Sequence, residues 1–126
     1  MKNKAIIIVC GEPRSIFLEI FFKSLNHRSY KSPLILISSL KLFKSQMKKF
    51  NFKRKINLIN YKNFDENDFD KRSINFIDVE LNISLKSNKI TNHSNLFIKK
   101  CFDIGLNLIK QKKSYKFING PISKKN

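Results

Sequence analysis

The sequence predicts an α/β protein built on an open, mostly parallel sheet with flanking helices. Two observations carry this prediction. Short, continuous apolar runs rich in isoleucine are typical of strands buried on both faces of a parallel sheet. These runs alternate with longer segments whose apolar residues recur at helical spacing, as in βαβ units with right-handed crossovers. At 126 residues, the chain can form one domain with a core that needs no disulfide or metal.

The first half of the chain follows a βαβαβ pattern. Its first apolar run ends at Gly11, a residue that permits a tight turn. The second run is followed by Ser38 and Ser39, both of which can cap a helix. The expected elements are a strand at 5–10, a helix at 16–25, a strand at 34–37, a helix at 40–50 and a strand at 56–59.

The second half adds two strands and the clearest helix. It begins with an acidic stretch at 61–72, where Phe69 falls on a calcium-ligand position and Asp70 replaces the glycine that a calcium loop requires. We therefore expect a solvated connector there. The expected elements after it are a strand at 73–79, an irregular stretch at 80–91, a helix from residue 92 or 93 to about 112 and a strand at 115–118.

The net charge of +17 leaves two interpretations open. Nearly all of the 26 basic residues are lysine, whereas specific phosphate and base readers depend on arginine, so the charge can be compositional drift on solvated faces. The alternative is a small basic α/β module that binds nucleic acid non-specifically, although the phenylalanines fall on apolar faces and leave no aromatic platform for bases. Weak, salt-sensitive binding to polyanions is expected in either case. The basic stripe of such a module would consist of Lys41, Lys44, Lys48, Lys49, Lys53, Arg54 and Lys55.

Cysteine usage and hydropathy predict a cytoplasmic protein. Cys10 and Cys101 lie inside apolar elements without CxxC spacing, which is typical of buried free thiols. The apolar run after residue 4 is too short for a signal peptide, and no segment reaches membrane-spanning length. The two histidines, His27 and His93, have no metal-ligand spacing, and we expect them on the surface.

Two loops that follow strands are the candidate site. Ligands of open α/β sheets bind beyond the carboxyl ends of the strands, and free N–H groups at a following helix start favour an anion. The first loop, Gly11-Glu12-Pro13, also fits a plain strand-to-helix turn with proline in the first helical position. In the second, Ser123 and Lys124 could bind a phosphate, or simply belong to an exposed basic terminus.

Together these loops resemble 4-hydroxythreonine-4-phosphate dehydrogenase, an enzyme of pyridoxal phosphate (vitamin B6) biosynthesis. That family opens with an apolar strand and the motif Gly-[Asp/Glu]-Pro-Ala-Gly-Ile-Gly-Pro-Glu, which this chain matches at Gly11, Glu12, Pro13, Ile16 and Glu19. The family's next feature, Pro-Leu-Val before a helix, is similar to the segment at 33–37. Its later helix and Thr-Ala-Pro-Ile-Asn-Lys-Glu motif are similar to residues 97–109 and 119–125. The order and spacing of the three pieces agree across nearly the whole chain.

The resemblance implies half of an isocitrate/isopropylmalate-dehydrogenase-like fold and an NAD-dependent, metal-requiring oxidoreductase. The family oxidises the secondary hydroxyl of 4-phosphooxy-threonine, a small phosphorylated substrate, and decarboxylates the product, using NAD and a divalent metal (zinc, magnesium or cobalt) in a homodimer. Its metal-binding histidines lie beyond the last matched motif. We therefore expect residues 1–126 to form a single incomplete domain that binds no cofactor by itself and has no dehydrogenase activity.

Departures from the family pattern bear on the first loop. Ser15 and Phe17 replace two glycines, Leu18 replaces a proline and Ser123 replaces an asparagine. Phe17 would intrude where backbone normally approaches a ligand, so the loop is either rebuilt or no longer meets substrate. Residues Gly11, Glu12, Pro13, Ser123 and Lys124 would line at most one wall of a cleft. A divergent member, a gene fragment or a truncated open reading frame would each produce this pattern. A further alternative is a split enzyme, in which a separately encoded C-terminal half assembles with this chain.

Overall fold

Five strands and three helices alternate along the chain in this computed structural model, which describes residues 5–11, 16–27, 32–62, 69–70, 72–81, 92–112 and 116–119. All five expected strands and all three expected helices are present, with bounds shifted by a few residues. The elements are β1 (Ile6–Val9), α1 (Phe17–His27), β2 (Leu34–Ser38), α2 (Leu40–Lys49), β3 (Ile56–Leu58), β4 (Ile74–Asp78), α3 (Asn92–Lys112) and β5 (Lys116–Asn119).

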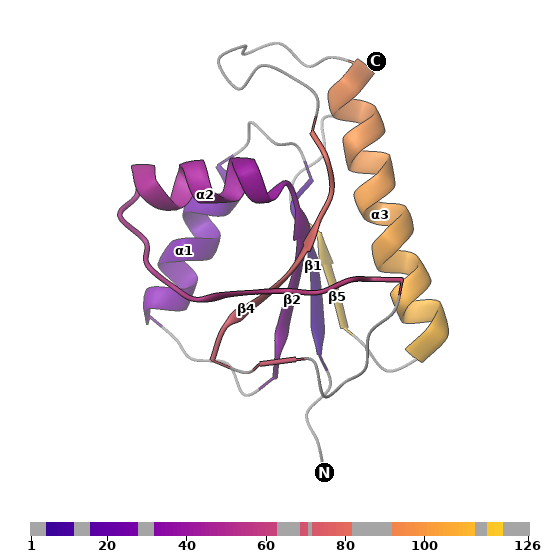
Figure 1. Cartoon of the computed structure of the whole chain (residues 1–126), viewed down its shortest axis with the longest axis horizontal. Helices are drawn as coiled ribbons and strands as arrows, with labels where there is room; N and C mark the ends of the chain where they lie inside the picture. Colours follow the sequence, from indigo (N-terminus) through magenta and orange to yellow (C-terminus); the bar gives the residue numbers. More distant parts are fainter. Residues whose placement is uncertain are drawn as a thin grey trace.

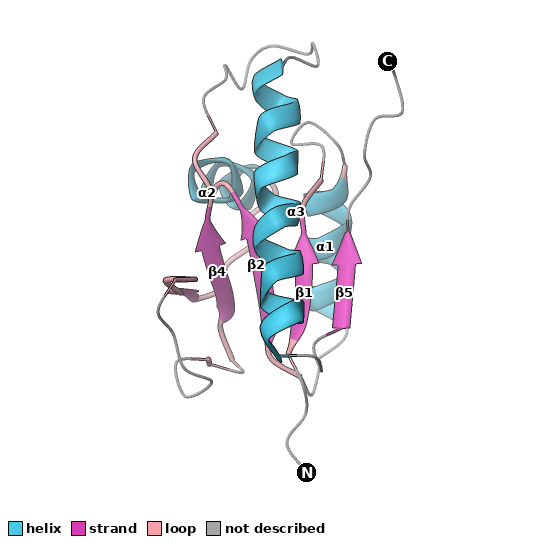
Figure 2. Ribbon diagram, turned by 90° about the vertical axis from the view of Figure 1, so that its right-hand side faces the viewer, coloured by secondary structure: helices cyan, strands magenta, loops and turns pink. Residues whose placement is uncertain are grey.

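The strands form one open, parallel sheet in the order β3-β4-β2-β1-β5. Each of the four neighbouring pairs is parallel, and Figure 2 shows the arrowheads of β4, β2, β1 and β5 pointing the same way. β1 and β2 are buried almost throughout, as strands covered on both faces must be. The predicted fold class, an α/β protein with a parallel sheet and flanking helices, is therefore confirmed.

Helices α1 and α2 cover one face of the sheet (Figure 1). Phenylalanine dominates the packing there. The ring of Phe22 on α1 stacks on Phe52 with 4.4 Å between centroids and meets the edge of Phe43 on α2 at 5.4 Å. The Phe43 ring lies 5.0 Å from Phe76 on β4. These aromatic contacts connect both helices to the centre of the sheet and add to the apolar burial.

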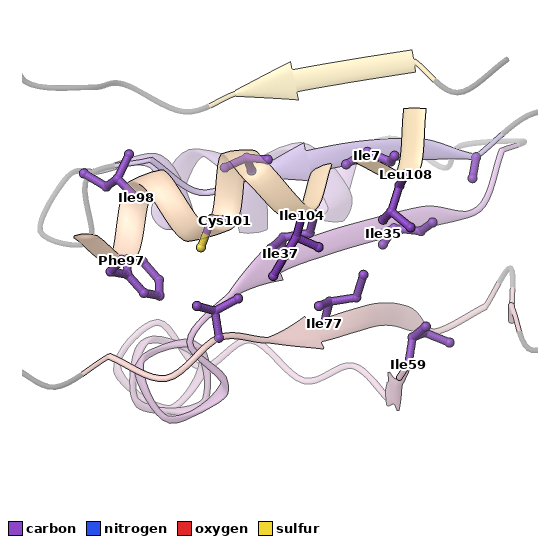
Figure 3. Packing of buried hydrophobic residues seen from close by; sticks show 13 residues of the cluster. Ile7, Ile35, Ile37, Ile59, Ile77, Phe97, Ile98, Cys101, Ile104 and Leu108 are labelled. Carbon is purple, nitrogen blue, oxygen red and sulfur yellow. The ribbon is translucent and has the colours of Figure 1, made fainter. Parts of the chain in front are cut away.

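Helix α3 covers the opposite face (Figure 1). Figure 3 shows Phe97, Ile98, Cys101, Ile104 and Leu108 turned toward the sheet, where isoleucines of β1, β2 and β4 meet them. Burial raises the pKa of the Cys101 thiol, with a smaller contribution from Cys10. Both cysteines are buried and form no disulfide, so the prediction of buried free thiols is confirmed.

A buried amide organises the amino ends of β2, β3 and β4. Asn75 of β4 faces Asn57 of β3 in the sheet register, and its Oδ1 accepts hydrogen bonds from Asn57 Nδ2 and the Asp70 backbone N–H, both at 2.9 Å. Its Nδ2 donates to the carbonyl oxygens of Leu34 and Asp70, both at 3.0 Å. All the hydrogen-bonding capacity of the Asn75 side chain is therefore used inside the protein.

The connector before β4 is fastened to this amide through Asp70. The Asp70 carboxylate accepts from the Ser73 hydroxyl at 2.7 Å and from the Arg72 backbone N–H at 2.9 Å, and these two bonds lower its pKa. Both carboxylate oxygens of Asp70 thus accept hydrogen bonds from neighbouring protein groups. The rest of the predicted connector (63–68 and 71) and most of the expected irregular stretch (82–91) lie outside the described residues.

One local prediction about helix starts was wrong. Ser38 is the last residue of β2 and not a cap, because the strand continues one residue further than the apolar run. Ser39 alone is the N-cap of α2. Helix α1 begins at Phe17, and the prediction for Pro13 falls outside the described residues. In the part of the chain that the structure describes, no helix is long and apolar enough to cross a membrane.

Candidate functional site

The carboxyl ends of the parallel strands lie along one rim of the sheet, and those of β1 and β5 are neighbours there. In register, Val9 at the end of β1 lies between Ile37 of β2 and Asn119 of β5. The chain leaves β1 toward β2 through α1, whereas β5 joins on the opposite side of β1. Such a reversal of strand order is the place where open α/β sheets bind ligands. The candidate site is therefore the β1/β5 end of this rim.

Gly11 is the last described residue after β1 at this end of the rim. It is buried and its φ is 79°, in the left-handed region where a side chain costs about 1 kcal/mol or more. The glycine lets the chain turn sharply out of β1 directly above the sheet. The backbone conformation of Gly11 is thus the one that the predicted turn needs, whereas the residues that follow it lie outside the described ranges.

The predicted loops leave neighbouring strands on the same rim. Residues 12 and 13 follow Gly11 of the β1 exit, and residues 120–124 follow Asn119 of β5, whose register partner is Val9. Glu12, Pro13, Ser123 and Lys124 themselves lie outside the described residues. Their roles stay predictions, but the strand ends from which they extend are adjacent, as the candidate site requires.

Phe17, where the resembling sequence motif has a glycine, is part of α1. It is the first residue of the helix, and its ring lies 6.4 Å from that of Phe21. An aromatic ring at this position therefore packs along its own helix.

At the β2/β4 end of the rim, the protein's own side chains occupy the start of α2. The Ser39 Oγ accepts from the Leu42 backbone N–H at 3.2 Å, and Asp78 Oδ1 of β4 accepts from the Leu40 N–H at 2.9 Å. A carboxylate beside a helix N-terminus is favoured by the helix dipole. Because two of its first N–H groups are already bonded, α2 offers no ready anion site.

Ser38 is a rim residue whose role the sequence did not indicate. It is fully buried, and its Oγ has no hydrogen-bond partner, although buried hydroxyls are normally paired. By strand alternation its side chain lies on the same face as Leu34 and Leu36, toward α1 and α2. A serine that ends an otherwise apolar strand is the signal that could have drawn attention to it.

The described residues do not form a metal or dinucleotide centre. Between Ala5 and Asn119, the described side chains include no cluster of three or more His, Cys, Asp or Glu residues that could hold a metal ion. The rim also lacks the closely spaced glycines of a dinucleotide fingerprint, since Gly11 is not followed by further glycines. The described residues therefore contain neither a cluster of metal ligands nor this particular dinucleotide motif.

The basic stripe predicted from the sequence is exposed, whereas the phenylalanine side chains of the described ranges are not. All seven of its members are exposed. In contrast, every phenylalanine of the described ranges is buried or half-buried, so base stacking has no platform there. The structure therefore does not favour the nucleic-acid-binding alternative.

Comparison with known proteins reveals a similarity of fold. No protein-family model and no curated protein sequence matches the chain. Solved structures do match it, among them three named as 4-hydroxythreonine-4-phosphate dehydrogenases. The protein from Salmonella typhimurium has a TM-score of 0.78 at 21% identity, that from Burkholderia phymatum 0.77 at 18%, and that from Klebsiella pneumoniae 0.76 at 19%.

The chain shares the fold of these dehydrogenases. The alignments cover 97%, 96% and 97% of this chain but only 39%, 37% and 38% of the three dehydrogenases, in the same order. The predicted resemblance is therefore confirmed at the level of structure, over somewhat more than a third of each dehydrogenase.

Proposed function

We propose that the chain is the part of a 4-hydroxythreonine-4-phosphate dehydrogenase that forms one wall of its substrate cleft. The observation that carries this proposal is the parallel pairing of β1 and β5, with Val9 beside Asn119. Because of this pairing, the two loops that carry the motifs begin side by side, at the point where the strand order reverses. The shared fold with the three dehydrogenases supports the same assignment.

In this proposal the wall binds and orients the small phosphorylated substrate. Lys124 and Ser123 contribute a cation and a hydroxyl to the phosphate, and Gly11 lets the β1 exit approach it without a side chain in the way. The NAD-dependent oxidation, the decarboxylation and the homodimer belong to the whole enzyme. The groups that hold the metal and cofactor come from polypeptide equivalent to the remainder of the dehydrogenases.

Titration of the isotopically labelled chain with 4-phosphooxy-L-threonine, followed by NMR, tests this wall. We expect saturable shifts of the Gly11 and Asn119 amides, no such shifts with L-threonine, and weaker binding in Lys124→Ala. Lys44→Ala, on the exposed face of α2, is the matched control and should leave the binding unchanged. Shifts confined to the basic stripe, or equal effects of the two substitutions, would contradict the proposal.

The same chain mixed with substrate, NAD and a divalent metal should form no NADH, because the described residues provide no metal or dinucleotide centre. Absorbance at the NADH band measures this directly. Turnover well above the enzyme-free background would show that the catalytic groups lie within residues 1–126. That result would contradict the proposal that the metal and the cofactor are held by other polypeptide.

A further inference from the structure

An apolar groove lies on the face of the sheet that carries α1, which Figure 2 shows behind β1 and β5. Its volume is about 170 Å³. Ile6 and Ile8 of β1 and Ile118 of β5 line one side, and Phe17 and Ile20 of α1 line the other. The described lining residues are apolar with one exception, a serine of α1. Apolar cavities of roughly 150 Å³ bind small hydrocarbons rather than water, so this groove has the character of a hydrocarbon site.

The groove opens to solvent along its length. Ile20 on the helix side remains 54% exposed, and Ile118 on the sheet side remains 49% exposed. Large apolar side chains that gather in one exposed groove mark a binding surface. A ligand that covers both isoleucines would therefore remove apolar surface from water, which favours binding.

A lysine stands on the same face at one end of this groove. Lys116 is the first residue of β5, and its register partner is Ile6, which lines the groove. Side chains alternate along a strand, so Lys116 projects to the same face as Ile118, two residues further on. Lys116 is exposed. The groove thus combines an apolar floor with a cation at its border.

The length of the groove corresponds to one short acyl chain. Phe17 and Leu25 of α1 both line it, and eight residues of helix rise about 12 Å. A saturated chain with bonds of about 1.5 Å at angles near 111° advances about 1.25 Å per bond, so about ten carbon atoms span this distance. The Leu25 end lies at the amino ends of the strands, because the chain leaves α1 there and enters β2 at Leu34. Lys116 borders this same end.

Larger occupants fit this groove poorly. An α-helix with its side chains is about 10 Å across, too wide to enter a groove of this volume. A second copy of the chain carries the same net charge of +17, and like charges oppose association. The same charge attracts a small anionic ligand. The observations therefore favour a single hydrocarbon chain with a negatively charged head.

We propose that this groove binds a straight-chain fatty acid of about ten carbon atoms. The hydrocarbon chain lies between α1 and Ile118, and the carboxylate accepts hydrogen bonds from the Lys116 ammonium group. The tail points toward Phe17 and the carboxyl ends of the strands. This binding site goes beyond the proposed function, because its charged end lies at the amino ends of the strands, opposite the rim that carries the candidate substrate wall.

Titration of the isotopically labelled 126-residue chain with hexanoate, octanoate, decanoate and dodecanoate, below the concentrations at which they form micelles, tests the site by NMR. We expect saturable shifts of the Ile20 and Ile118 methyl groups. The methyl groups of Leu58 and Leu106, which are 59% and 54% exposed on β3 and α3, should not shift. Affinity should rise about tenfold from octanoate to decanoate, because each buried methylene contributes. Dodecanoate should bind little more tightly than decanoate, since its last carbons extend past the groove.

Two variants separate the apolar groove from the charged head. Ile20→Glu should weaken decanoate binding by at least about tenfold, because it places a negative charge in the apolar contact. Lys116→Gln should weaken it by about threefold to fivefold, the contribution of an exposed ion pair, and should leave the binding of uncharged octanol unchanged. Leu106→Glu and Lys99→Gln, at exposed positions of α3, are the matched controls and should leave decanoate binding unchanged.

Several results would overturn the inference. Affinity that does not depend on chain length, equal shifts of all four methyl-bearing residues, or equal effects of groove and control substitutions would each reject the site. Loss of the helical circular dichroism signal as decanoate is added would show detergent-like unfolding in place of binding. If Ile20→Glu unfolds the chain, the chain-length series and Lys116→Gln still decide the question.

Discussion

At the scale of single residues, Asn75 is the polar side chain on which most of the described structure depends. It is fully buried and bonds to three different segments: β2, β3 and the connector at Asp70. A buried amide with all its bonds made specifies one arrangement of its neighbours, because any other arrangement leaves polar groups unpaired. Asn75 thus fixes the position of β4 between β2 and β3.

Replacing this amide should be among the most destabilising single changes in the sheet. Asn75→Leu keeps the approximate volume but leaves the Leu34 and Asp70 carbonyls and the Asp70 N–H without their partner. We expect the free energy of unfolding to fall by roughly 2–4 kcal/mol, measured by urea denaturation. Asn57→Ala is the control, since it removes the bond from Asn57 Nδ2 to Asn75 Oδ1 at a half-buried position but leaves the other bonds of Asn75 in place, and it should cost about 1 kcal/mol. A smaller loss for Asn75→Leu than for the control would refute this role.

At the scale of elements, the contact between α3 and β5 depends on one glycine. A Cβ at Gly105 would lie 2.8 Å from the Phe117 ring and 3.2 Å from a Val9 methyl. The first of these neighbours belongs to β5 and the second to β1. The absence of a side chain therefore lets the helix lie close to both strands that frame the candidate site.

Two substitutions of Gly105 should differ in their effect on stability, because the added side chains differ in size. In Gly105→Ala the gain in helix propensity, about 1 kcal/mol, should nearly cancel the displacement of the Phe117 ring. Gly105→Val adds two methyl groups against Val9 and should cost about 1–3 kcal/mol. Urea denaturation measures both, with Asn107→Val on the exposed side of α3 as the control for propensity alone. Equal losses for the two valine variants would show that the helix does not approach the sheet closely here.

At the scale of the whole molecule, the excess of positive charge should produce binding without specificity. We expect the chain to bind heparin or duplex DNA at low salt and to release it near 0.15 M salt, where charges are screened within about 8 Å. If the attraction is general, Lys44→Gln with Lys48→Gln should weaken binding as much as Lys99→Gln with Lys100→Gln on α3. All four lysines are exposed. A selective effect of the first pair, measured by fluorescence anisotropy, would favour a dedicated nucleic-acid surface.

The sequence allowed the elements and the rim of the site to be predicted, but not the order of the strands. Isoleucine-rich runs and the stripe of α3 specify their own secondary structure through local periodicity, and parallel crossovers place the exits of β1 and β5 on one rim. The position of β4 between β2 and β3 is accompanied by a hydrogen bond between Asn57 and Asn75, which are 18 residues apart. No local sequence pattern predicts that these two side chains are in contact. The unpartnered Ser38 hydroxyl likewise results from tertiary burial alone.

The strand order also sets the sequence of events during folding. Among the described strands β5 is paired with β1, although Lys116 and its register partner Ile6 lie near opposite ends of the described residues. Closing so large a loop is entropically costly and slow. We therefore expect the β1–β5 pairing to form late in folding, so that the two strand ends of the candidate site come together after most of their neighbours have paired.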